Sequence, residues 1–293
     1  MNPLLAVWLC WAIVGFSPIA GRYAVGVISP ALLVFLGTLL AVAFFAPWLT
    51  RHHQWRTLFA KETIWKFLFI GTFGTALPFS ILLWALHYTT PGNAAILQQS
   101  ELLYSLLIAS VFLRERPSRG QLLGSALILG GVVLILLKEH YSVRWTGDLM
   151  VVGCTWMLQA ASCLAKKLPK HLDHRLIAAA RNVYALPALA VILAFLVWQN
   201  GFTFEPGGRS LGVLFYTGIF KYGWAMILWY QALRALDLSK ITAIYLSYPV
   251  LSFVLSVLLG MEQPHLYQLF GLLLTLAGAY WVSFIVKKQQ EPK

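Results

Sequence analysis

The sequence predicts an all-α polytopic membrane protein, with ten transmembrane helices in two inverted five-helix repeats around a central cavity. Three observations carry this prediction. The 293 residues are 59% hydrophobic and only 11% charged, long apolar runs recur along the chain, and the second half repeats a motif of the first. Soluble domains carry roughly 25% charged residues, so lipid must be the solvent for much of this surface.

The apolar runs define the predicted spans, because a helix needs about 20 mostly apolar residues to cross a bilayer. Backbone in lipid must satisfy its own hydrogen bonds, so each run is predicted to be a helix. No basic residue precedes the first run, so we expect a membrane helix there and not a cleaved leader. The predicted spans are residues 4–20, 29–48, 64–86, 93–113, 120–137, 147–165, 176–197, 210–233, 239–260 and 265–286.

The loops between these spans differ in basic charge, which sets the orientation. With a cytoplasmic N-terminus, the inner segments contain Arg51, Arg56, Lys61, Lys66, Arg114, Arg116, Arg119, Lys166, Lys167, Lys170, Arg175, Arg234, Lys240, Lys287, Lys288 and Lys293. The outer segments contain only Arg22, Lys138, Arg144 and Arg209. We therefore expect both termini to be cytoplasmic, in a plasma (bacterial inner) membrane. The net charge of +12 follows from this topology, and nucleic-acid binding is not expected.

A shift of 147 residues aligns the two halves of the chain. It places Glu115-x-Pro117 on Glu262-x-Pro264, Gln121-Leu122-x-Gly124 on Gln268-Leu269-x-Gly271, and Gly131 on Gly278. The pattern predicts a first repeat over residues 1–143 and a second over 144–293. Because each repeat has five helices, an odd number, the second must enter the membrane from the opposite side. Inverted repeats with a site near the bilayer midplane recur among secondary transporters.

Short motifs add a resemblance to a known family. They are Leu9-Cys10-Trp11-Ala12, the turns Thr89–Ala95 and Asp237–Ala243, Tyr248-Pro249, and the two repeated blocks. On these residues the chain resembles the EamA-type branch of the drug/metabolite transporter (DMT) superfamily, and within it the bacterial YddG-like amino-acid and metabolite exporters. The resemblance implies ten helices, a central cavity and export of small metabolites by alternating access. Two positions depart from the family pattern, with Leu102 replacing a usual proline and Ala12 a usual glycine.

Ionisable residues inside membrane helices are functional candidates by default. Glu101 and Lys221 lie near the middle of predicted spans and Arg181 about one turn inside another. Helical spacing puts Gln98 and Tyr104 on the face of Glu101, and Trp224 on that of Lys221. The polar or aromatic pairs Trp156/Gln159 and Tyr245/Tyr248 lie deep in their spans. The expected substrate-binding residues are Gln98, Glu101, Tyr104, Trp156, Gln159, Arg181, Lys221, Trp224, Tyr245 and Tyr248.

Two interpretations of the buried charges stay open. In the first, Glu101 binds a substrate ammonium or a proton and Lys221 binds a substrate carboxylate. In the second, Glu101 forms an ion pair with Lys221 or Arg181 that locks the two halves together. A pair that breaks during transport satisfies both interpretations.

Other functions lack their motifs. Neither H-E-x-x-H nor a nucleotide-binding G-x-x-x-x-G-K-[ST] occurs, and we expect no enzyme activity, no catalytic residues and no cofactor. His171-x-x-His174 has no third ligand nearby, so no metal is expected. A membrane-embedded enzyme and a passive scaffold or regulatory subunit remain the alternatives. The expected partners are a small-molecule substrate and the lipid bilayer, with protons as a candidate coupling ion, and a monomer suffices.

Overall fold

The structure is a computed structural model that describes residues 1–136, 144–261 and 263–290. Every named element in these ranges is helical, and a single antiparallel bridge joins Ile28 to Phe204. The described residues contain ten helical segments that are long and apolar enough to cross a membrane. The predicted all-α fold with ten membrane-spanning helices is therefore confirmed. Some residues named in the sequence analysis lie outside the described residues. They are Lys138, Glu262, Lys293 and Val143, the last residue of the predicted first repeat.

Half of the predicted spans are uninterrupted α-helices. These are α3 (Pro30–Arg51), α9 (Arg119–Leu136), α10 (Trp145–Lys166), α11 (His174–Asn200) and α16 (Leu266–Gln290). The short helix α4 (Trp55–Leu58) lies in the loop that follows α3. The other spans consist of two or three elements each, and these interruptions position the candidate site.

Two composite spans contain a π-helix, whose backbone N–H groups bond to the carbonyl five residues back. The third span comprises α5 (Ile64–Gly71), η1 (Thr72–Ala76) and α6 (Leu77–Ala85), and the eighth comprises α12 (Gly208–Phe215), η2 (Tyr216–Trp224) and α13 (Ala225–Ala235). In η1 the Leu77 N–H bonds to the Thr72 carbonyl. Pro78, the next residue, has no N–H to donate to Gly74 four residues back, which favours irregular winding there. The 147-residue shift places Gly74 on Lys221, so both π-helices lie at aligned positions.

The fourth and ninth spans are broken helices. The fourth consists of α7 (Pro91–Leu97) and α8 (Ser100–Phe112), and the ninth of α14 (Leu238–Tyr245) and α15 (Pro249–Leu258). Pro249 lacks an N–H and disfavours helical geometry in the residue before it, which explains the second break. Leu102 takes the aligned position in the first half, so that break forms without a proline. The first span is also divided, into α1 (Pro3–Gly15) and α2 (Ser17–Ala24).

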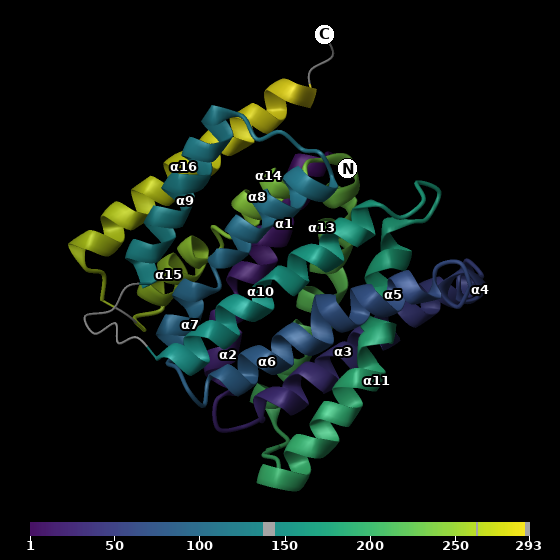
Figure 1. Cartoon of the computed structure of the whole chain (residues 1–293). Helices are drawn as coiled ribbons and strands as arrows, with labels where there is room; N and C mark the ends of the chain where they lie inside the picture. Colours follow the sequence, from purple (N-terminus) through teal and green to yellow (C-terminus); the bar gives the residue numbers. More distant parts are fainter. Residues whose placement is uncertain (137–143, 262, 291–293) are drawn as a thin grey trace.

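Helices α9 and α16, which the repeat aligns with each other, lie side by side (Figure 1). A Cβ atom added to Gly278 would lie 2.6 Å from the Gly124 carbonyl oxygen, and one added to Gly271 would lie 2.6 Å from that of Gly131. Such close backbone approach is typical of small residues at membrane helix interfaces. Position 124 faces 278 while position 131 faces 271, so the two helices are antiparallel. The 147-residue shift aligns Gly124 with Gly271 and Gly131 with Gly278. The two contacts are therefore exchanged when the two halves are exchanged.

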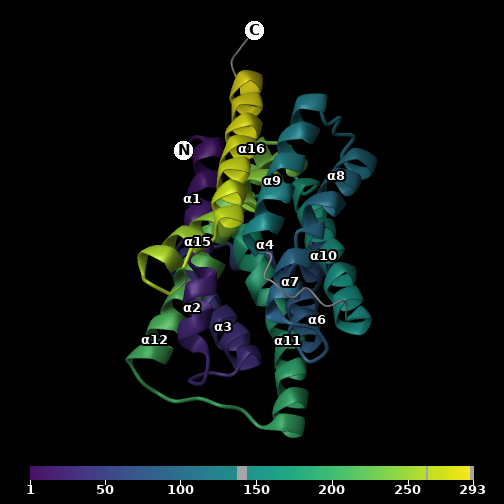
Figure 2. The ribbon, with the colours of Figure 1, turned by 90° about the vertical axis from the view of Figure 1, so that its left-hand side faces the viewer.

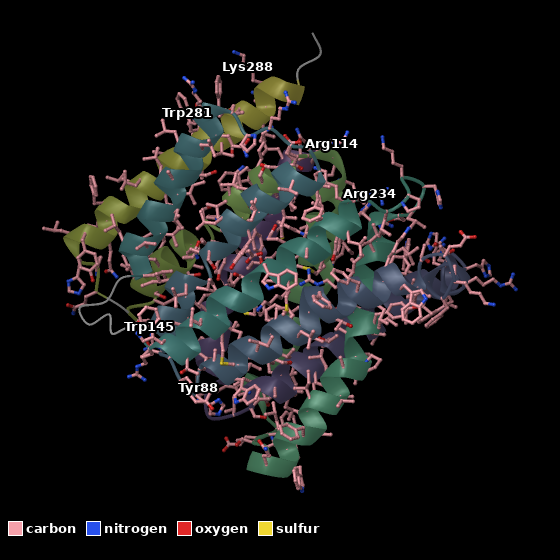
Figure 3. All side chains as sticks on the ribbon, viewed as in Figure 1. Tyr88, Arg114, Trp145, Arg234, Trp281 and Lys288 are labelled. Atoms are coloured by element: carbon pink, nitrogen blue, oxygen red, sulfur yellow. The ribbon has the colours of Figure 1, made fainter. Side chains whose placement is uncertain are left out.

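The two ends of the chain lie at the same end of the bundle. Met1 and the C-terminal end of α16 are close to each other in both ribbon views (Figures 1 and 2). Figure 3 places Arg114, Arg234 and Lys288 toward this end and Tyr88 and Trp145 toward the other. The labelled basic side chains thus gather at the end that the charge pattern predicts to be cytoplasmic.

Candidate functional site

Glu101 lies in the first turn of α8, directly after the break in the fourth span. An acidic side chain is favoured there by the positive end of the helix dipole. Its Oε1 accepts a hydrogen bond of 2.6 Å from Nε2 of Gln159 on α10. The Thr242 hydroxyl on α14 lies 3.4 Å from Oε1 of the same amide. Gln159 therefore joins a carboxylate of the first half to the broken ninth span.

Lys221 lies in the middle of η2, and its side chain borders two aromatic rings. Its Nζ lies 6.0 Å from the centre of the Phe79 ring and 5.7 Å from that of the Tyr222 ring. Among the described residues, no carboxylate oxygen lies within 4.0 Å of this ammonium. An ammonium held against aromatic faces gains cation–π attraction and keeps its N–H groups available for an anion.

Arg181 on α11 uses its guanidinium to bind the protein itself. Nε donates to the hydroxyl of Thr75 at 2.8 Å, and Nη2 donates to the Gly74 carbonyl, both in η1. Nη1 lies 3.0 Å from the sulfur of Met226 on α13. The planar fork of an arginine suits such simultaneous contacts. Arg181 thus connects the third, seventh and eighth spans.

Aromatic side chains from the eighth and ninth spans form a continuous wall. The Trp229 and Tyr245 ring centres lie 5.0 Å apart, and those of Tyr245 and Tyr248 lie 5.9 Å apart. Tyr245 ends α14 and Tyr248 precedes α15, so the break in the ninth span brings both rings to the same place. These distances are in the range of favourable aromatic pairs.

These groups surround one internal cavity of about 130 Å³. One water molecule needs about 10–15 Å³ on a comparable measure, so the space exceeds that of a few waters. The cavity has charged groups from both halves of the chain and the aromatic wall on one side. Its lining residues are Val14, Ser17, Phe79, Gln98, Gln99, Glu101, Leu158, Ser162, Arg181, Lys221, Tyr222, Met226, Trp229, Tyr245, Leu246 and Tyr248.

Comparison with known proteins identifies the chain's family. The EamA-like transporter family matches it twice, over residues 2–137 and again over residues 145–284. The chain belongs to the EamA-like transporter family. The resemblance to the EamA-type branch of the DMT superfamily is thereby confirmed, and the protein is a polytopic membrane transporter by family.

Individual relatives agree with this assignment. An "uncharacterized transporter" of Archaeoglobus fulgidus is 26% identical over 264 residues, covering 86% of this chain and 87% of the relative. A "probable terminal-alkyne amino-acid exporter" of Streptantibioticus cattleyicolor is 27% identical over 209 residues, covering 69% of this chain and 67% of the relative. One crystal structure superposes with a TM-score of 0.82 at 18% identity and covers 99% of both chains, a likeness of fold.

The structure of this EamA-like transporter places six of the ten expected binding residues on the cavity. They are Gln98, Glu101, Arg181, Lys221, Tyr245 and Tyr248. Gln159 is buried behind the cavity and contacts Glu101 through its amide. Tyr104 packs against the main hydrophobic core.

Trp156 and Trp224 do not line the cavity. Trp156 is 36% exposed and pairs with Phe73 at 6.0 Å. Trp224 is 47% exposed and pairs with Phe44 at 5.8 Å. The expected shared face of Lys221 and Trp224 rests on α-helical spacing, but η2 winds with five-residue hydrogen bonds, which rotates the two side chains apart.

Several lining residues were not predicted, among them Phe79, Tyr222, Met226 and Trp229. Tyrosine and tryptophan are common at membrane interfaces, so their presence in a span does not mark a cavity. For Tyr222, the adjoining Lys221 was the available signal. The position of Phe79 depends on η1, which precedes it and alters the register of α6.

The ion pair of Glu101 with Lys221 or Arg181, one of the two interpretations left open by the sequence, is not formed in this conformation. Within the described ranges, the salt bridges join Lys166 to Glu115, His174 to Asp173 and Lys240 to Asp237. Glu101 bonds to Gln159, while Arg181 bonds to η1. The cavity therefore presents a carboxylate and two cationic groups that do not neutralise each other by direct contact.

A second polar junction lies between the halves, away from the cavity. Glu115, in the loop after α8, accepts hydrogen bonds from Lys166 Nζ at 2.7 Å and from the Leu238 N–H at 2.8 Å. Lys166 also donates to the Leu236 carbonyl at 2.6 Å. Glu115 thus caps the N-terminus of α14, as expected for an acidic residue that fixes a helix end.

Proposed function

We propose that this protein is a secondary transporter that exports amino acids or similar small metabolites across a bacterial inner membrane by alternating access. The observation that carries the proposal is the cavity in which Glu101 and Lys221 face the same space without pairing. An ammonium in that space binds a substrate carboxylate. The carboxylate of Glu101 receives a substrate ammonium or a proton.

The aromatic wall supports a substrate with an apolar or aromatic part. Trp229, Tyr245 and Tyr248 present ring surface to the cavity, which Glu101 and Lys221 also line. A zwitterion with an apolar side chain would match both kinds of lining. The Streptantibioticus relative is named a "probable terminal-alkyne amino-acid exporter", and this name supports the same substrate class.

The inverted arrangement of two five-helix repeats, over residues 1–143 and 144–293, supplies the means of alternating access. The antiparallel packing of α9 on α16, and the aligned π-helices and breaks, support it. The two family matches fall on either side of the proposed boundary. In this proposal the two repeats rock about the cavity, the monomer is sufficient, and both termini face the cytoplasm.

The test is transport by the purified protein in proteoliposomes, with a panel of labelled amino acids and small carboxylates, with and without a pH gradient. We expect at least one zwitterionic solute to cross faster than in protein-free vesicles. Glu101→Gln and Lys221→Met should each reduce that flux. Ser110→Ala and Phe220→Leu change exposed residues of α8 and η2 and should leave it unchanged. Absence of transport for every solute under every gradient would reject the proposal and favour a scaffold or an enzyme.

A further inference from the structure

Two consecutive side chains of α11 reach the π-helices η1 and η2. Arg181 donates to the Gly74 carbonyl of η1, and Asn182 donates through Nδ2 to the Tyr222 carbonyl of η2 at 3.1 Å. The Asn182 amide also donates to Ala178 one turn earlier, at 2.9 Å, and the residue is 2% exposed. One helix therefore holds a backbone carbonyl in the irregular segment of each half.

The carbonyl that Arg181 binds has lost its α-helical donor. In a regular helix the N–H of residue 78 would bond to Gly74, but residue 78 is proline. A buried carbonyl gains from any replacement donor, because an unsatisfied polar group in a dry interior is costly.

The carbonyl that Asn182 binds belongs to the residue after Lys221. A hydrogen bond to Tyr222 fixes the η2 backbone at the point from which the Lys221 side chain enters the cavity. The Tyr222 ring also borders the lysine ammonium. Any change in the winding of η2 would move the ammonium relative to Glu101.

We propose that Arg181 and Asn182 form a positioning pair, which holds η1 and η2 in fixed register with α11 and so sets the place of Lys221 in the cavity. In this view Arg181 acts through the backbone of η1 and is not an anion-binding group for the substrate. The consequence for transport depends on the proposed function, but the positioning itself does not.

Substitutions can separate positioning from charge. Arg181→Lys keeps the positive charge but cannot make the same forked contacts, and Asn182→Leu removes the amide donor while keeping the branched shape and the charge unchanged. We expect each to raise KM for a carboxylate-bearing substrate about tenfold, the typical effect of a lost buried hydrogen bond, with a smaller change in kcat. Val191→Leu, at an exposed position of α11, is the matched control. If Arg181→Lys transports like the wild type, charge is sufficient and the proposal is wrong.

Pro78 offers a specific rescue. Pro78→Ala restores a backbone N–H that can bond to Gly74, so it should recover most of the activity lost in Arg181→Met. Pro187→Ala, which changes an exposed proline within α11, should give no recovery. A charge role for Arg181 predicts no recovery from either proline change, and that outcome would overturn the proposal.

A labelling experiment tests the positioning of residue 221 without measuring transport. The native cysteines Cys10, Cys154 and Cys163 are buried, so Lys221→Cys provides the reactive position for a charged thiol reagent, with the unmodified chain as background. We expect Asn182→Leu, and Arg181→Met, to change the labelling rate at position 221 about tenfold, and Pro78→Ala to reverse the effect of Arg181→Met. Unchanged rates in both variants would reject positioning. Absence of wild-type transport alongside altered rates would reject only the proposed function.

Discussion

Glu115 caps α14 through Ser239, a residue 124 positions later in the chain. Its Oε2 accepts from the Ser239 hydroxyl at 2.9 Å and from the Ser239 N–H at 3.2 Å, while Oε1 accepts from Lys166. The side chain of Glu115 is 7% exposed. A loop of the first half thus supplies the helix cap that the second half lacks, and the junction ties the two together.

Removing this cap should destabilise the protein. Glu115→Ala leaves the Leu238 and Ser239 N–H groups without their acceptor and Lys166 without its anion, and a helix cap alone is worth about 0.5–2 kcal/mol. We expect a lower thermal unfolding midpoint in detergent, measured by intrinsic fluorescence, and a smaller decrease for Ser239→Ala. Arg116→Gln, at an exposed position in the same loop, serves as the control. Equal midpoints for Glu115→Ala and the wild type would contradict the structure.

Two adjacent glycines of α9 should respond differently to alanine. A Cβ on Gly131 would lie 2.5 Å from the Gly271 carbonyl oxygen, whereas one on Gly130 meets no atom within 4 Å. Gly131→Ala should therefore separate α9 from α16 and lower the yield of monodisperse protein in size-exclusion chromatography. Gly130→Ala should elute as the wild type does. The α9–α16 interface would be wrong if the two variants behaved alike.

Comparing two modes of transport can show whether Glu101 carries a coupling proton or binds the substrate. If the carboxylate carries the coupling proton, Glu101→Gln should abolish accumulation driven by a pH gradient and retain exchange of labelled for unlabelled substrate. The amide keeps the size of the side chain and an oxygen that accepts from Gln159. Loss of exchange along with driven transport would assign Glu101 to substrate binding.

Lys221 should discriminate between substrates by charge. Lys221→Met preserves most of the side-chain volume but removes the ammonium, so KM should rise for a carboxylate substrate by at least about tenfold. For an amide or ester analogue of the same substrate, KM should change little. Competition assays in proteoliposomes measure both values. A similar KM increase for the two ligands would mean that the substitution acts on η2 and not on an anion.

The predicted orientation can be read from two exposed arginines. Arg116 lies in the loop after the fourth span, and Arg209 lies at the start of α12, where the eighth span begins. Both residues are exposed. In intact cells, a membrane-impermeant thiol reagent should label Arg209→Cys and leave Arg116→Cys unlabelled until the membrane is opened. The reverse pattern would invert the topology, and labelling of both positions in intact cells would contradict the assignment of opposite sides.

The number of spans was predictable because apolar length is a local property of the chain. The interruptions were not, since they depend on contacts between distant residues. The break before Ser100 has no proline, and η2 is held by Asn182 from another span. The same reason explains why Trp224 does not line the cavity. Glu101, Lys221 and Arg181, selected by their charge alone, do line it, whereas Trp224 was placed beside Lys221 by a helical spacing that η2 does not follow.

The unequal charges of the cavity have a consequence for how such a protein can originate. A dimer of two identical five-helix chains would present every cavity side chain twice about its symmetry axis, so a lysine at position 74 would bring a second lysine with it. In the single chain the aligned positions carry Gly74 and Lys221, and Glu101 aligns with Tyr248. Joining two copies in one polypeptide removes this restriction. A cavity with single, different charges, able to distinguish the two ends of a small molecule, is a property that a symmetric dimer of identical chains cannot have.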